Sequence, residues 1–201
     1  MKKSIGIKIT VLFLITVLSA SSLLSFILYQ QSNKMVTQNV ANEAYRIAKD
    51  ASKEIDITEF MKLKNIEDEK KDSYIQMRNK LEHLCSISGA KYIFTMTKLN
   101  DGKFMYVVDG SPLENMSHIG DTEESIAGYE KAWSGEPYIS DKIQNIGEWG
   151  ILVSSYYPLK DNGGNVVGIV GVEYDAEGAY LGLKKFKTTC ILSFLVFAII
   201  I

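Results

Sequence analysis

Two carboxylates interrupt stretches of the sequence that are otherwise apolar, and they are its strongest candidates for chemistry. Asp109 ends the run 104–108, and Glu173 follows the run 167–172. Burying a carboxylate in such a run is costly unless the group is paired or hydrogen-bonded. If both face one cavity, they predict attraction for a cationic or amine-bearing ligand. The alternative is that each lies at a solvated strand edge.

Aromatic and hydroxyl residues are the candidates for the wall of such a cavity. Three residues combine an apolar ring with a polar tip: Tyr106, Trp149 and Tyr156. For any one of them, ordinary core packing is the alternative. Ser154 and Tyr156 share one face of an expected strand, and Ser155 and Tyr157 share the other. Polar residues on both faces indicate that one face is not plain core, and the pattern alone leaves both open.

The sequence offers little for catalysis or metal binding. Its two cysteines, Cys85 and Cys190, and its two histidines, His83 and His118, show no metal-ligand spacing. It contains no nucleophile elbow and no phosphate-binding glycine loop. We therefore expect no cofactor, no metal and no enzyme activity. The net charge of −2 gives no strong field for nucleic acid.

The elements that position the candidate side chains alternate between hairpins and helices. Residues 91–99 and 103–110 predict a β-hairpin, because glycine in the Asn100-Asp101-Gly102 turn accepts a positive φ at little cost. Two longer strands follow within 149–175, around a turn at 161–165.

Helices and a short strand complete the expected fold. Apolar residues at steps of three and four predict a helix over Lys34–Ile55, which could pack on its own domain or on a second copy. A second helix is expected over 72–88, a third over Thr122–Ser134 capped by Asp121, and a short strand over 137–143. The class is α+β, and the sheet face left to loops is a natural place for a small ligand.

The two ends of the chain predict membrane helices. Residues 9–33 carry no charge and follow Lys2, Lys3 and Lys8. As a helix they would span about 37 Å, which exceeds the ~30 Å hydrocarbon core. We expect a cytoplasmic N-terminus at 1–8 and transmembrane helix 1 at 9–29, with a cleaved signal peptide as the alternative.

Residues 188–201 are also uncharged, yet they are too few to span a bilayer by themselves. We expect them to be the truncated start of transmembrane helix 2, in a chain that is part of a longer protein. A short buried or interfacial helix is the alternative. The segment 30–187 is then an extracytoplasmic domain, and the chain belongs to the cell membrane.

Several short blocks, taken in order, resemble extracytoplasmic Cache domains. The blocks are YIFTM at 92–96, YVVD at 106–109, GEPYIS at 135–140, WG at 149–150, Ser154, Tyr156, PLKD at 158–161 and VGIVGVE at 167–173. Together with the flanking apolar helices, they are similar to the single-Cache, PAS-like sensors of bacterial chemoreceptors, histidine kinases and diguanylate cyclases.

The resemblance implies a PAS-like antiparallel sheet that binds a small extracellular molecule and signals across the membrane. It implies a homodimer and cytoplasmic signalling partners reached through an output domain beyond Ile201. It selects Ser154 and Tyr156 over the opposite face of their strand, and it assigns Glu173 to a ligand amine. The arginine and tryptophan that amino-acid-binding members carry near the first strands are missing here.

The ligand-binding residues expected from these arguments are Tyr106, Asp109, Trp149, Ser154, Tyr156 and Glu173. The expected function is the sensor region of a chemotaxis transducer. A membrane diguanylate cyclase or histidine kinase is the alternative, and a membrane-anchored enzyme is a further one.

Overall fold

A seven-stranded antiparallel sheet carries the candidate residues in the computed structural model, which describes residues 5–200. The strand order is β3-β2-β1-β7-β6-β4, and β5 also pairs with β6. The strands are β1 (Tyr92–Lys98), β2 (Phe104–Asp109), β3 (Thr122–Glu123), β4 (Tyr138–Ile139), β5 (Gln144–Asn145), β6 (Ile151–Lys160) and β7 (Val166–Asp175). The predicted α+β class, with an antiparallel sheet and a long N-terminal helix, is confirmed.

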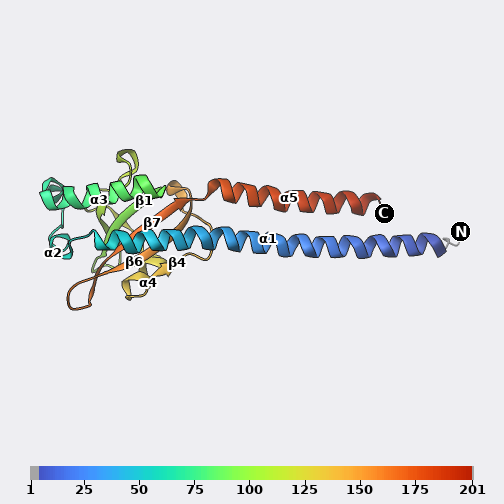
Figure 1. The fold of residues 1–201 in the computed structure, drawn as a ribbon, viewed down its shortest axis with the longest axis horizontal. Helices are drawn as coiled ribbons and strands as arrows, with labels where there is room; N and C mark the ends of the chain where they lie inside the picture. Colours follow the sequence, from blue (N-terminus) through green and yellow to red (C-terminus); the bar gives the residue numbers. More distant parts are fainter. Residues whose placement is uncertain (1–4, 201) are drawn as a thin grey trace. The chain divides into compact units, whose positions relative to one another are not determined.

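Helices cover the two faces of the sheet unequally (Figure 1). The α-helices are α1 (Ile5–Lys53), α2 (Ile57–Phe60), α3 (Asp72–Ser88), α4 (Ala127–Trp133) and α5 (Glu177–Ile200), and the 3-10 helices are η1 (Ile66–Lys70), η2 (Leu113–Asn115) and η3 (Gly147–Trp149). Side chains of α1 and α3 share one apolar cluster with Ile93, Val108 and Val172 of the sheet. On the other face, α4 packs on Phe104 and Tyr156. Short segments complete that second face, and the candidate residues lie there.

The described chain forms two compact units. One comprises Thr37–Ala176, and the other is made from the chain up to Val36 and from Glu177 onward. Of the helices in the described residues, α1 alone is long and apolar enough to cross a membrane, with a mean hydropathy of 2.4 over its most apolar window. The predicted spans at 9–29 and 188–201 and the extracytoplasmic domain at 30–187 remain predictions.

The apolar stripe of the second half of α1 packs on its own domain. Ala44, Ile47 and Ala51 are buried in the same cluster as residues of α3 and the sheet. This is the first of the two alternatives left open by the sequence. The homodimer remains a prediction.

The helix predicted over Thr122–Ser134 is wrong in its first third. Thr122 and Glu123 are extended and pair with Met105 and Phe104 of β2. The Asp121 carboxylate does not cap a helix there, because it accepts a hydrogen bond from the His118 N–H at 2.8 Å. The helix begins only at Ala127.

The strand predicted over 137–143 is also shorter than expected. The strand comprises Tyr138 and Ile139, which pair with β6, and the Ser140 N–H still donates to the Ser154 carbonyl oxygen at 3.1 Å. Ser140 then turns the chain, with its hydroxyl donating to the Lys142 carbonyl oxygen at 2.7 Å.

Candidate ligand-binding site

A bulge in the central hairpin brings two of the candidate residues to one face. Opposite β1, the register passes from Phe94 paired with Asp109 to Met96 paired with Tyr106, so Val107 is an extra residue in β2. In a regular strand, residues three apart point to opposite faces. The extra residue removes this offset and places Tyr106 and Asp109 on the same side of the sheet.

The Thr95 side chain fixes the bulge from the opposite face. Its hydroxyl accepts a hydrogen bond from the Val108 N–H at 2.8 Å and donates to the Val108 carbonyl oxygen at 3.0 Å. Both residues are fully buried. Backbone groups that the bulge would leave unpaired therefore have partners.

Asp109 holds the loop that follows β2. Its carboxylate accepts hydrogen bonds from the N–H groups of Ser111, at 2.7 Å, and Ser117, at 2.8 Å. The residue is only 3% exposed. Burial raises the pKa of Asp109, and the Ser111 side chain, the two backbone hydrogen bonds and the charge of Arg78 counteract that shift.

Glu173 lies on β7, directly between Tyr92 of β1 and Ser154 of β6. One carboxylate oxygen, Oε1, accepts hydrogen bonds from Ser154 Oγ at 3.0 Å and Tyr156 OH at 2.8 Å. The residue is 5% exposed, and burial raises its pKa, an effect that these two hydroxyl groups oppose. The described residues supply Glu173 with no ion-pair partner.

Gly171 makes room beside Glu173 for an aromatic ring. A Cβ atom at this position would lie 2.5 Å from the Phe94 ring. The strand can therefore carry Glu173 and still admit Phe94 against its backbone.

Trp149 closes the site. It lies in residues 144–150, which we call the Trp149 segment. Its indole Nε1–H donates to Glu123 Oε1 at 3.0 Å, and its ring meets Tyr92 edge-on at 5.6 Å between centroids. Lys91 Nζ donates to the Trp149 carbonyl oxygen at 2.9 Å. Gly150 ends the segment with φ at +98°, a conformation that favours glycine.

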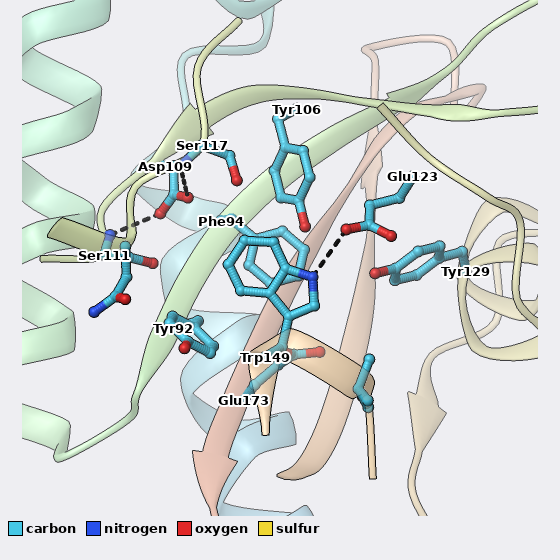
Figure 2. Close-up of a pocket in the computed structure, with 12 residues that line it drawn as sticks. Tyr92, Phe94, Tyr106, Asp109, Ser111, Ser117, Glu123, Tyr129, Trp149 and Glu173 are labelled. Carbon is cyan, nitrogen blue, oxygen red and sulfur yellow. Dashed lines mark hydrogen bonds between the residues drawn. The ribbon is translucent and has the colours of Figure 1, made fainter. Parts of the chain in front are cut away.

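These residues line one small cavity of about 20 Å³. Figure 2 shows the Trp149 indole at its centre, with Asp109 and its two serine partners on one side and Glu123 and Tyr129 on the other. The full lining is Tyr92, Phe94, Tyr106, Asp109, Ser111, Asn115, Ser117, Glu123, Tyr129, Ile146, Trp149 and Glu173. We call this the Glu173 pocket. It has room for about one water molecule in this conformation.

The pocket surrounds its carboxylates with aromatic side chains. Burial raises the pKa of the Tyr106 and Tyr129 phenols, so both remain protonated around neutral pH. The Ser111 hydroxyl is fully buried and makes no hydrogen bond of good geometry with the described residues, although it lies close enough to the Asp109 carboxylate to lower the pKa of that group. The arrangement can hold a small polar molecule, and no group of side chains in the described residues is arranged to bind a metal ion.

The structure places four of the six sequence-predicted site residues in the pocket lining. They are Tyr106, Asp109, Trp149 and Glu173. Ser154 and Tyr156 do not line the cavity, but both hydroxyl groups hydrogen-bond to Glu173. On the opposite face, the Ser155 hydroxyl donates to the Ala41 carbonyl oxygen of α1 at 2.8 Å, so Ser155 is bound to the helix layer.

Glu123 is the charged residue of the pocket that the sequence does not reveal. The pattern predicts a helix start at this position, whereas Glu123 lies on β3 and binds the Trp149 indole. A β-branched residue before it, Thr122, was the available signal for an extended conformation.

Comparison with solved structures finds sensory domains. The sensory domain of the Campylobacter jejuni chemoreceptor Tlp3 (CcmL) with isoleucine bound has a TM-score of 0.48 and 12% identity; the match covers 85% of this chain and 62% of that one. The E. coli DcuS sensor domain has a TM-score of 0.49 and 15% identity, with 77% of this chain and 98% of that chain covered.

The periplasmic sensory domain of the Campylobacter jejuni chemoreceptor Tlp1 has a TM-score of 0.43 and 14% identity, covering 74% of this chain and 58% of that one. The chain thus spans about six-tenths of the length of the chemoreceptor domains it matches. No family model matches the sequence, and no curated protein matches it.

Proposed function

We propose that this chain is the sensory part of a bacterial membrane receptor, a chemotaxis transducer, and that it binds a small molecule in the Glu173 pocket outside the cell. One observation carries the proposal. The Glu173 pocket holds buried carboxylates and a buried hydroxyl group that the protein leaves without full partners. Buried polar groups of this kind are costly unless something completes them, and a ligand would do so.

The lining supports binding over catalysis. Among the described residues that line the pocket there is no histidine, cysteine or lysine. The hydroxyl groups of Ser111 and Ser117 therefore have no histidine or lysine beside them as a base, and the neighbouring Asp109 carboxylate already accepts hydrogen bonds from the N–H groups of both serines. The enzyme alternative would need turnover by the purified chain.

The connection from pocket to helices suggests how binding is transmitted. Glu173 lies on β7, which ends at Asp175, and α5 begins at Glu177. A ligand that prefers one arrangement of β7 would shift the population of states, and a displacement of order an ångström or two is typical of receptor helices. The predicted homodimer and the output domain belong to the same proposal, with a diguanylate cyclase or histidine kinase as the other output.

The test uses the indole that closes the pocket. In a Trp133→Phe variant of the full chain in lipid nanodiscs, Trp149 is the only tryptophan left and reports on the pocket by fluorescence. We expect at least one metabolite from a panel of amines, carboxylates, amino acids and nucleobases to change that fluorescence and to raise the melting temperature.

A Tyr106→Ala variant should lose that response, whereas Tyr180→Ala, in α5, should keep it. If no compound changes either signal, the sensory proposal is wrong. Release of a chemically altered product would support an enzyme instead.

A further inference from the structure

The Glu173 pocket is unusual in the charge of its lining. Three carboxylates, Asp109, Glu123 and Glu173, line it, and no lysine or arginine does. The nearest basic groups are engaged elsewhere. Lys91 Nζ binds the Trp149 carbonyl oxygen and lies 5.0 Å from the Tyr92 ring centroid. Arg78 Nη1 pairs with Glu82 at 2.9 Å, while its buried Nη2 has no hydrogen-bond partner among the described residues and its charge lowers the pKa of Asp109. A ligand carboxylate entering this pocket would find no cation among the residues that line it.

The carboxylates still have unused acceptor positions. Glu173 receives both of its hydrogen bonds on Oε1, and Glu123 receives its hydrogen bond from Trp149 on Oε1. The described residues give no hydrogen bond to Oε2 of either residue. Because Glu173 is 5% exposed, bulk solvent does not reach it, and the cavity has room for only about one water molecule beside it. An ammonium group has the N–H donors and the charge that these oxygens lack.

Aromatic faces surround the same space. The lining includes five aromatic side chains: Tyr92, Phe94, Tyr106, Tyr129 and Trp149. In Figure 2 the Tyr106 hydroxyl, the Trp149 indole and the Glu123 carboxylate approach one another at the centre of the pocket. Aromatic rings attract organic cations and shelter their carbon atoms from water, an effect that is strongest for tryptophan. Rings and carboxylates together thus favour a cation with a carbon skeleton over a bare metal ion.

The size of the cavity indicates where the ligand enters. About 20 Å³ is too little for any organic ligand, so binding requires one wall to move. The Trp149 segment is the candidate, because its indole is half-buried and is tied to the opposite side of the pocket by the Glu123 hydrogen bond. A ligand N–H that donates to Glu123 would take the place of the indole N–H.

We propose, resting on the sensory function above, that the ligand is a small organic ammonium ion that carries no carboxylate and that it displaces the Trp149 indole from Glu123. The class comprises amines with at least one N–H. Amino acids are excluded because their carboxylate has no cationic partner in the pocket, and quaternary ammonium ions are excluded because they cannot donate to Glu123.

The experiment compares molecules that share an isobutyl group and differ in their polar group, together with three further amines and ammonium ions. Isoamylamine, isoamyl alcohol, isovalerate and leucine are titrated by calorimetry into the full chain in nanodiscs, alongside methylamine, putrescine and tetramethylammonium. We expect an amine to bind at least tenfold more tightly than its alcohol, carboxylate and amino-acid counterparts. Glu123→Gln and Glu173→Gln should each weaken amine binding at least tenfold.

Glu124→Gln is the matched control, because its side chain is 80% exposed and pairs with Lys103 outside the pocket. It should bind the amine as the natural chain does. The emission of Trp149 in the Trp133→Phe background should change on amine binding, and the same change should appear without ligand in Glu123→Ala.

Different failures have different meanings. If leucine, isovalerate or isoamyl alcohol binds as tightly as the amine, and that binding is lost in Tyr106→Ala, the ammonium proposal is overturned while the sensory function stands. The displacement of Trp149 is overturned if tetramethylammonium binds tightly. It is also overturned if Glu123→Gln leaves the affinity for the amine unchanged. If no compound of any class binds, both proposals fall.

Discussion

At the scale of single residues, the pocket is defined by carboxylates buried without a counter-ion. Among the described residues, Glu173 has only two hydroxyl groups that stabilise its charge, and its burial favours the neutral acid. The free chain, by contrast, ionises glutamate at its usual pKa of about 4.5. Burial of the Glu173 carboxylate is unfavourable in the free protein, and a cationic ligand bound beside it would stabilise the charged form.

The burial of Glu173 predicts a stability that depends on pH. Because its folded pKa is raised, the folded chain keeps a proton that the unfolded chain releases as pH rises above about 4.5. The free energy of unfolding therefore falls as pH rises through the window between the two pKa values. Glu173→Gln removes this loss and keeps an acceptor for Ser154 and Tyr156.

We expect Glu173→Gln to melt above the natural chain at pH 8, by about 4 °C if the gain is about 1 kcal/mol. The difference should shrink as pH falls toward 4.5, which scanning calorimetry at several pH values can follow. Glu124→Gln should track the natural chain throughout. A Glu173→Gln variant that melts lower at pH 8 would show that the charge is stabilised in a way these contacts do not explain.

The residues of the pocket differ in how far the sequence reveals them. Asp109 and Glu173 stand out because each breaks an apolar run, but that pattern leaves open whether they are buried, and the structure shows that both are. Glu123 does not stand out, because it lies among exposed acidic residues at 121–124 and becomes a pocket residue only through the indole of Trp149. A contact between residues so far apart in the chain leaves no local pattern.

At the scale of elements, the bulge in β2 is the feature that assembles the pocket. Tyr106 and Asp109 both face the pocket only because Val107 is an extra residue in β2. The Thr95 hydroxyl forms hydrogen bonds with the Val108 N–H and carbonyl groups, which the bulge would otherwise leave unpaired. The bulge thus depends on one hydroxyl group of the neighbouring strand.

Replacing Thr95 by valine keeps the shape of the side chain and removes the hydroxyl. The buried Val108 N–H then loses its partner at 2.8 Å, which we expect to cost ~1–3 kcal/mol in the free energy of unfolding. Ligand affinity should fall about tenfold as well, because Tyr106 and Asp109 depend on the bulge; that corresponds to ~1.4 kcal/mol.

Thr97→Val is the control on the same strand. Thr97 only donates to the Val167 carbonyl oxygen at 3.0 Å, so no N–H group loses a partner. Denaturant unfolding and calorimetric titration compare the two variants. Equal ligand affinity in Thr95→Val and the natural chain would mean that the bulge does not orient the pocket.

The long elements were predictable and the short ones were not. The helix at 72–88 and the four strands of the two hairpins have strong periodic patterns and clear turns, and the structure has all of them. The two-residue strands β3 and β4 are held by tertiary pairing with β2 and β6. Their extended conformation is set by the neighbouring strand, which leaves no signal in the local sequence. The local pattern therefore predicts a helix over β3 and a strand that is longer than β4.

At the scale of the whole molecule, the membrane prediction can be tested independently of the ligand. In a Cys190→Ser background the remaining cysteine, Cys85, is buried. A cysteine at Asp101, in the exposed hairpin turn, should react with a membrane-impermeant maleimide in intact cells. A cysteine at Lys8 should react only after lysis, because the N-terminus is predicted to be cytoplasmic.

The reverse labelling pattern would place the domain in the cytosol and remove the receptor proposal. The intact mass of the purified chain decides the signal-peptide alternative. A chain that keeps its N-terminal residues is anchored, and a shortened chain found in the medium is secreted.

The pocket is connected to α1 by a small cluster on the far side of the sheet. Ala41 of α1, Val153 of β6 and Ala176 pack together, and Ala41 and Val153 are at most 1% exposed. Ala176 directly follows β7, which carries Glu173, and its N–H donates to the Ile151 carbonyl oxygen at 2.8 Å. A shift of β7 on binding would therefore change the packing against α1.

Ala41→Leu overfills this cluster without touching the pocket. We expect a loss of ~1–3 kcal/mol in stability together with tighter ligand binding, about fivefold or more. The larger side chain destabilises the arrangement described here, in which the pocket is too small for a ligand, and so favours other arrangements of β7. Asn42→Leu, at the next and exposed position, should change neither quantity. Titration calorimetry and thermal unfolding measure both. A variant that loses stability and keeps the natural affinity would show that this cluster supports the fold and takes no part in transmission.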